Sequence, residues 1–123
     1  MTDKLIFKIP FLTAGLNGSD GLMQLHYMKA KKIKDNLCLI LKSQKPSQMH
    51  PIDEPVRLTY IRYTSLYMDW DNCCASFKYI GDALQEAGVL QDDSPVIIDE
   101  FVPKQVKSKR KDARIEVIIE FLN

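Results

Sequence analysis

Two pairs of aspartates, one on each side of a helix-like segment, offer the ligands that bind a hard divalent cation. Asp69 and Asp71 are separated by one residue, and Asp92 and Asp93 follow the helix-like segment. If the first pair lies on extended chain, its carboxylates point the same way and Trp70 between them points into the core. Mg²⁺ takes oxygen ligands and keeps several waters, so carboxylates and a substrate phosphate complete its site. The pattern therefore predicts a magnesium site that can bind substrate phosphate oxygens.

Asp71 also has a purely structural alternative. A helix N-terminus favours a carboxylate, so Asp71 could simply cap the helix that follows it. A calcium loop of the EF-hand type is excluded, because Cys74 stands where that loop needs glycine and Ile80 where it needs glutamate. Capping and metal binding both remain open from the spacing alone.

The position of Asp93 relative to the first pair is a geometric problem. A single helix over residues 71–87 is about 24–26 Å long, and Asp93 leaves from its far end. The extended chain from Ala87 to Asp93 recovers at most about 20 Å. Asp93 therefore returns along the helix to the first pair, belongs to a turn, or completes the site of a second copy in a dimer.

The elements that must position these residues are four strands and two helices. β-rich segments predict strands over 5–9, 56–63, 96–102 and 115–121, and helical periodicity predicts helices over 23–41 and 71–87. The basic turn at 108–112 predicts a hairpin between the last two strands. The order β-α-β-α-β-β predicts an α/β (layered α+β) fold, with two main helices on one face of a small mixed sheet.

Length and composition indicate one globular domain over residues 1–123. Hydrophobic residues make up 46% of the chain and charged residues 27%, and no apolar run approaches the roughly 18–20 residues of a membrane span. The three cysteines have no CxxC spacing, which argues against a disulfide framework or a zinc knuckle. The start of the chain has no secretory cleavage pattern. We therefore expect a cytoplasmic protein with no membrane segment and no nucleotide cofactor.

The charges are unevenly distributed along the chain. Residues 68–100 contain eight acidic side chains and one base, Lys78, although the whole chain has a net charge of only +1. The bases gather on either side of this segment, and a basic cluster is typical of a phosphate-binding surface. A solvated face is the alternative for any such run. The candidates for DNA contacts are Lys29, Lys32, Lys107, Lys109, Arg110 and Lys111.

Four short motifs occur in order over residues 56–102: DWDN at 69–72, DAL at 82–84, AGVL at 87–90 and DD at 92–93. This set resembles the DxDN…DAL…AG…DD signature of the RusA family. These proteins are Holliday junction resolvases (crossover junction endodeoxyribonucleases), often encoded by phages and prophages.

The resemblance implies a homodimer that cleaves four-way, branched DNA in recombination and repair, with Mg²⁺ as cofactor and Mn²⁺ as a substitute. It implies metal binding by Asp69, Asp71 and Asp93, with Asp92 as the alternative member of its pair. The family has a functional lysine on the helix after DxDN, and Lys78 is the one lysine available there. Lys78 lies six residues past Asn72, farther along than the family pattern places it.

Two other functions remain open. One is a catalytically silent DNA-binding or interaction domain that keeps the fold. The other is a small metal-dependent hydrolase that acts on RNA or a nucleotide.

Overall fold

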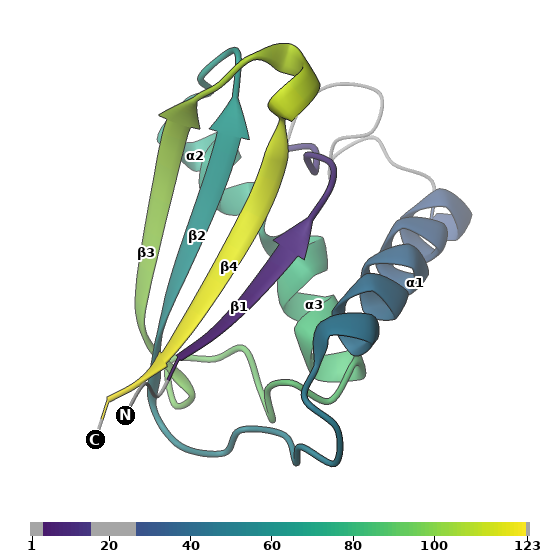
Figure 1. Cartoon of the computed structure of the whole chain (residues 1–123), viewed down its shortest axis with the longest axis vertical. Helices are drawn as coiled ribbons and strands as arrows, with labels where there is room; N and C mark the ends of the chain where they lie inside the picture. The colour runs from purple at the N-terminus through teal and green to yellow at the C-terminus, as the bar shows by residue number, and fades with distance from the viewer. Residues whose placement is uncertain (1–3, 16–26, 123) are drawn as a thin grey trace.

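In the computed structural model, which describes residues 4–15 and 27–122, the helices lie against one face of a four-stranded sheet (Figure 1). The elements in chain order are β1 (Lys4–Ile9), α1 (Tyr27–Gln44), β2 (Val56–Thr64), α2 (Trp70–Ala75), α3 (Lys78–Glu86), β3 (Ile98–Lys107), the 3₁₀ turn η1 (Arg110–Asp112) and β4 (Arg114–Phe121). The predicted layered fold and element order are confirmed, apart from a break in the second helix.

The sheet is mixed, with strand order β1-β4-β2-β3. β2 pairs with β3 in parallel, while β4 pairs with both β1 and β2 in antiparallel fashion. Parallel neighbours need a crossover connection, and α2 and α3 supply it between β2 and β3. β3 forms one edge of the sheet and carries Pro103, which stands opposite Tyr60 of β2.

The predicted hairpin at 108–112 is wrong. β2 lies between β3 and β4, so the last two strands are not hydrogen-bonded neighbours. The basic segment instead passes over the end of β2, where the Ser108 N–H donates to the Thr64 carbonyl at 2.9 Å (Figure 1). β3 also runs to Lys107 instead of ending at 102, because its partner β2 is long enough to pair with it throughout.

The predicted helix over 71–87 is broken at Ser76 and Phe77. The Ser76 hydroxyl donates to the Cys73 carbonyl at 2.5 Å, a local hydrogen bond that competes with helix continuation. The Phe77 ring packs against the rings of Tyr60 and Phe101, with centroids 5.2 and 4.9 Å away. These contacts hold the break against the sheet, so α2 and α3 are two short helices.

α1 ends at Gln44, three residues beyond its predicted end, and the start of the predicted helix at 23–26 lies outside the described residues. Leu37, Cys38 and Leu41 are its buried residues, while most of its lysines are exposed. Within the ranges that the structure describes, no helix is long and apolar enough to cross a membrane.

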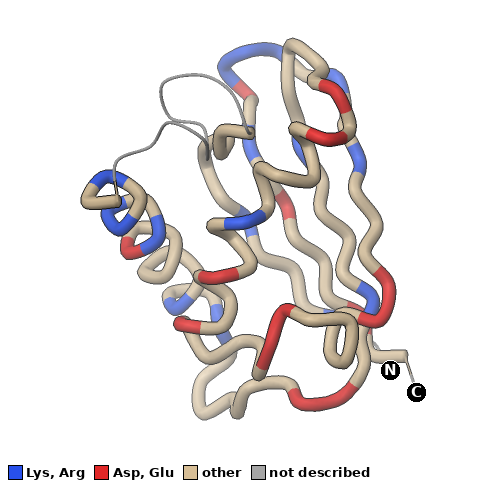
Figure 2. Tube along the Cα trace, turned by 180° about the vertical axis from the view of Figure 1, so that it is seen from behind, with Lys and Arg blue, Asp and Glu red and all other residues tan. Residues whose placement is uncertain are grey.

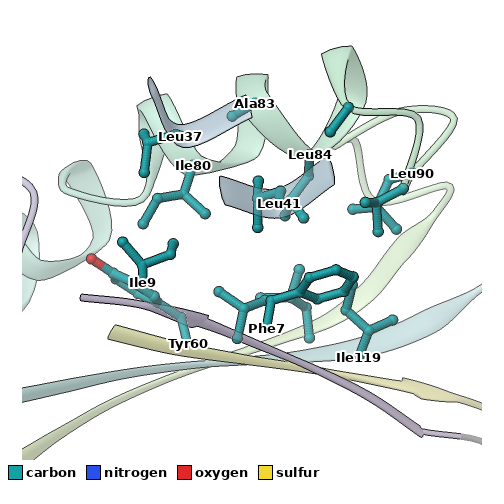
Figure 3. Packing of buried hydrophobic residues seen from close by; sticks show 14 of the residues in the cluster. Phe7, Ile9, Leu37, Leu41, Tyr60, Ile80, Ala83, Leu84, Leu90 and Ile119 are labelled. Atoms are coloured by element: carbon teal, nitrogen blue, oxygen red, sulfur yellow. The ribbon is translucent and has the colours of Figure 1, made fainter. Parts of the chain in front are cut away.

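The core lies between the helices and the sheet (Figure 3). Leucine and isoleucine side chains of α1 and α3, among them Leu37, Leu41, Ile80 and Leu84, point toward residues of β1, β2 and β4. The fully buried members include Phe7, Ile9, Leu37, Leu41, Leu58, Tyr60, Ile80, Leu84, Ile115 and Ile119. Burial of these apolar side chains is the main stabilising contribution to the fold.

No helix of the described residues covers the opposite face of the sheet (Figure 1). Side chains of neighbouring strands pair across it instead. Arg57 Nε lies 2.8 Å from Glu100 Oε2, and the Arg114 guanidinium lies 3.8 Å from the centroid of the Tyr63 ring. Cross-strand pairs of this kind stabilise a solvated sheet face by a few tenths of a kcal/mol to about 1 kcal/mol each.

Candidate metal centre and nucleic-acid surface

Asp69 and Asp71 lie at the start of α2, and the predicted extended geometry is wrong for Asp71. Asp69 occupies the N-cap position with φ −58° and ψ 151°, and Asp71 lies in the first helical turn. Helix formation begins at Trp70, whose side chain is 56% exposed and therefore does not anchor the core. The capping alternative for Asp71 is also wrong, because the N-cap is Asp69 and its side chain makes no capping hydrogen bond.

Both carboxylates are exposed, and neither has a hydrogen-bond or ion-pair partner among the described residues. Carboxylates near a helix N-terminus are stabilised by the partial positive charge of its free N–H groups. Because both carboxylates are exposed and have no partner among the described residues, their oxygens are available to a cation that keeps several waters.

Contacts from two directions hold the start of α2. Met68 is clamped by the Gln105 side chain of β3: the Met68 N–H donates to Gln105 Oε1, and Gln105 Nε2 donates to the Met68 carbonyl, both at 2.9 Å. On the other side, Gly15 packs so closely that a Cβ there would lie 2.9 Å from the Asn72 carbonyl oxygen. Asp69 and Asp71 are therefore presented by a fixed backbone.

A buried polar cluster lies beneath this helix and includes Arg62, which sequence reasoning missed. Arg62 is 4% exposed; its Nη1 donates to the Thr13 carbonyl at 2.7 Å, and its Nε has no hydrogen-bond partner among the described residues. The Thr13 hydroxyl donates to the Ser76 carbonyl at 2.6 Å, and Ser76 Oγ lies 2.6 Å from the Tyr60 hydroxyl. The cluster fastens the loop after β1 to the end of α2.

Strand alternation is the signal that could have found Arg62, since it places this residue on the same face as Leu58 and Tyr60. Its charge also affects the neighbouring thiol of Cys73. Burial raises the pKa of Cys73, and the positive charge of Arg62 acts in the opposite direction. Cys73 is therefore a neutral core residue.

Lys78 and Asp93 both line a cleft of about 640 Å³. Lys78 begins α3; its side chain is 58% exposed, and its Nζ lies 3.3 Å from Asp82 Oδ1. Asp93 lies against the same helix, where its Oδ2 would be 3.2 Å from a Cβ added at Gly81. The absence of a side chain at Gly81 thus allows the carboxylate to approach α3.

Asp92 forms part of a turn. Its Oδ1 accepts a hydrogen bond from the Asp93 N–H at 2.8 Å, and a hydrogen bond from the Ser94 side chain lowers the pKa of its carboxyl. This hydrogen bonding orients the Asp92 carboxylate within its own loop, whereas Asp93 lines the cleft. Between the two, Asp93 is the better candidate for a metal ligand.

One chain does not gather all the predicted metal ligands. Among the described residues, no group of three or more Asp, Glu, His or Cys side chains is close enough to hold a metal ion. Asp69 follows Met68, which is fixed to Gln105 near the end of β3, whereas Asp93 shares its cleft with Ile98 at the start of β3. Figure 1 shows the same separation, with α2 at the upper end of the sheet and the segment between α3 and β3 at the lower end.

The predicted DNA-binding residues form two sets on different elements (Figure 2). Lys29 and Lys32 lie on α1, and the other four are Lys107, Lys109, Arg110 and Lys111, at the end of β3 and in η1. Lys107 Nζ lies 4.4 Å from the centroid of the Tyr67 ring, close in the chain to Asp69. The second set, called the η1 cluster below, therefore lies at the same end of the molecule as Asp69.

Comparison with protein-family models and with curated proteins finds no match to this chain.

Proposed function

We propose that this chain is a Mg²⁺-dependent, structure-selective DNA endonuclease that resembles the RusA resolvases and acts on four-way junctions. The observation that carries the proposal is that Lys78 and Asp93 line one cleft, while the exposed carboxylates of Asp69 and Asp71 lie at the start of the preceding helix α2. Lys78 would stabilise the negative charge of a phosphodiester, which the carboxylates alone would repel. The free thiols of Cys38, Cys73 and Cys74 suit a cytoplasmic site of action.

The donor chemistry of the acidic residues fits Mg²⁺. Asp69 and Asp71 offer exposed carboxylate oxygens with no protein partner among the described residues, and Asp93 offers a third. The metal, when bound, supplies charge stabilisation and an activated water for hydrolysis. Because Asp93 does not form a group with Asp69 and Asp71 within one chain, we propose that Asp93 of a second copy supplies the third carboxylate.

A homodimer also suits the substrate. A four-way junction has near two-fold symmetry and is resolved by two paired nicks. A C₂ dimer presents two identical sites at a fixed separation, so the symmetry of the protein matches that of the DNA.

Lys78 is proposed to contact the phosphate that is cut. Asp82 holds its ammonium group on the exposed side of α3, and a second cation, Lys34, lies 3.9 Å from the other oxygen of Asp82. If the Lys78 ammonium group turns from Asp82 to a phosphate oxygen, Lys34 can still neutralise the Asp82 carboxylate. This arrangement favours stabilisation of the leaving oxygen.

The test is cleavage of a synthetic four-way junction with Mg²⁺ present and then chelated. We expect paired nicks near the branch point that stop when EDTA is added and resume with excess Mg²⁺, with Mn²⁺ as a substitute. Linear duplex and RNA of the same sequence are the controls. Equal rates on all three substrates would contradict junction selectivity, and cleavage that survives chelation would contradict the metal.

A catalytically silent DNA-binding domain is the second candidate. The lack of a three-carboxylate group within the described residues favours it. It predicts tight junction binding with no cleavage at any protein concentration, whereas a dimeric enzyme gains activity as the concentration rises through the dimer dissociation constant.

The η1 cluster gives a separate prediction for binding. Replacement of Lys109, Arg110 and Lys111 by glutamine is expected to reduce the slope of log affinity against log salt by about 3, since each phosphate contact contributes about 0.9. The measurement is a fluorescence-anisotropy titration with labelled junction at several salt concentrations. Lys4→Gln, an exposed lysine on β1, is the control and should leave the slope unchanged. An unchanged slope in the triple variant would place the DNA surface elsewhere.

A further inference from the structure

The cleft that holds Lys78 and Asp93 has walls that the proposed chemistry does not use. It is lined by Cys74, Ala75, Phe77, Pro95, Ile98 and Phe101 in addition to the two charged residues. The walls come from the break between α2 and α3, from the turn after Asp93 and from the start of β3. An apolar cleft of about 640 Å³ that opens to solvent and is lined by one lysine is a candidate ligand-binding site.

The aromatic rings in the walls are fixed in position. The Phe77 and Phe101 centroids are 4.9 Å apart with ring planes inclined at 54°, and both rings also contact the buried Tyr60 at 5.2 and 6.3 Å. Tyr60 is itself held by its hydroxyl contact with Ser76. The rings therefore form a rigid surface, and a rigid aromatic surface suits a planar ligand that stacks.

We propose that this cleft takes one unstacked nucleobase of the DNA substrate, with the backbone of the same strand lying over Lys78. The inference rests on the proposed function, which brings a DNA strand to Lys78. A base removed from its stack is then within reach of the aromatic walls, and base–aromatic stacking accepts every base because each has a π-face. Enzymes that do chemistry on a base show that a flipped base can be held in a pocket by stacking on aromatic and apolar side chains.

The charges at the cleft favour a base over a phosphate group. Apart from Asp93 and Lys78 the lining residues are uncharged and mostly apolar, and Lys78, the one cation among them, has a side chain that is 58% exposed. Taking a base out of its stack costs least where pairing is already disturbed, and we take the branch point to be that part of the substrate. The cleft would thus link cutting to the branched structure of the DNA, not to its sequence.

Cys74 allows a test on the unmodified chain. It lines the cleft and is exposed, whereas Cys38 and Cys73 are buried, and the chain has three cysteines in all. Iodoacetamide should therefore alkylate Cys74 first. Its alkylation rate, measured by mass spectrometry, reports whether the cleft is covered, and it does not depend on cleavage.

The experiment compares three DNAs at concentrations that saturate binding in a gel shift, with EDTA present so that the DNA stays intact. They are a four-way junction, the same junction with abasic sites at the four branch-point positions, and a linear duplex. We expect the intact junction to slow Cys74 alkylation at least about fivefold, because one stacked base contributes about a factor of ten in occupancy. The abasic junction and the duplex should leave the rate within about twofold of the free protein.

Each other outcome has a definite meaning. Equal protection by the abasic junction would show that the DNA backbone alone covers the cleft and would overturn the proposal. Binding and cleavage of the junction without protection of Cys74 would overturn the base site and leave the endonuclease intact. Slow alkylation of the free protein that speeds up on dilution would identify the cleft as an interface between two copies. Failure to bind any junction would remove the proposed function and the base site together.

Discussion

Replacement of Asp71 with asparagine is expected to reduce Mg²⁺-dependent cleavage of a four-way junction by about 100-fold or more, while junction binding is retained. Asn keeps the size of the side chain and one oxygen but removes the negative charge that a metal ligand supplies. The Asp71 carboxylate has no hydrogen-bond or ion-pair partner among the described residues, so its replacement should leave the fold intact. The measurements are single-turnover cleavage and a gel shift on the same preparation.

Asp53→Asn is the matched control, since Asp53 is an exposed aspartate in the connection before β2, outside the proposed site. It should cleave at the rate of the parent protein. If Asp71→Asn also cleaves at that rate, the carboxylate is not a ligand and the endonuclease mechanism loses its metal centre. Loss of both cleavage and binding would instead assign Asp71 to the DNA surface.

The largest effect on stability is expected for Leu84→Ala, which should lower the free energy of unfolding by about 3 kcal/mol. Leu84 is fully buried, and its side chain lies between α3 and the sheet (Figure 3). Leucine and alanine are both good helix formers, so the loss of stability reports packing and not helix propensity. Urea unfolding followed by circular dichroism measures the difference at an unchanged m-value.

Glu86→Ala provides the comparison within the same helix, because Glu86 is exposed at the end of α3. A change within about 0.5 kcal/mol is expected there. A loss below about 1 kcal/mol for Leu84→Ala would mean that α3 is not packed on the sheet as described.

The layered fold could be predicted because its signals are local. β-rich composition marked the four strands, and Ile80 and Leu84, at helical spacing in α3, are buried. Strand pairing could not be predicted, because the basic turn at 108–112 has the composition of a hairpin loop. The insertion of β2 between β3 and β4 depends on tertiary packing, which local composition does not report.

The residues of the candidate site could be proposed from the sequence, but their geometry could not be predicted. The helix break at Ser76 depends on the Tyr60 hydroxyl and the Phe101 ring, both distant in the sequence. Phe77 and Lys78, at that break, line the same cleft as Asp93. The environments of Trp70 and Arg62 could not be predicted for the same reason. Trp70 is exposed because α2 begins there, and Arg62 is buried where it donates to the carbonyl of Thr13 in the loop after β1.

Pro103 has a consequence for how this chain behaves at high concentration. The outer edge of β3 would otherwise present a regular row of amide donors that a strand from another molecule could extend into a fibril. Proline has no amide hydrogen, so the row is interrupted at the middle of the strand. A Pro103→Val variant would restore the row of amide donors. We expect it to form ordered aggregates on prolonged storage, measured as a rise in thioflavin fluorescence relative to the parent protein.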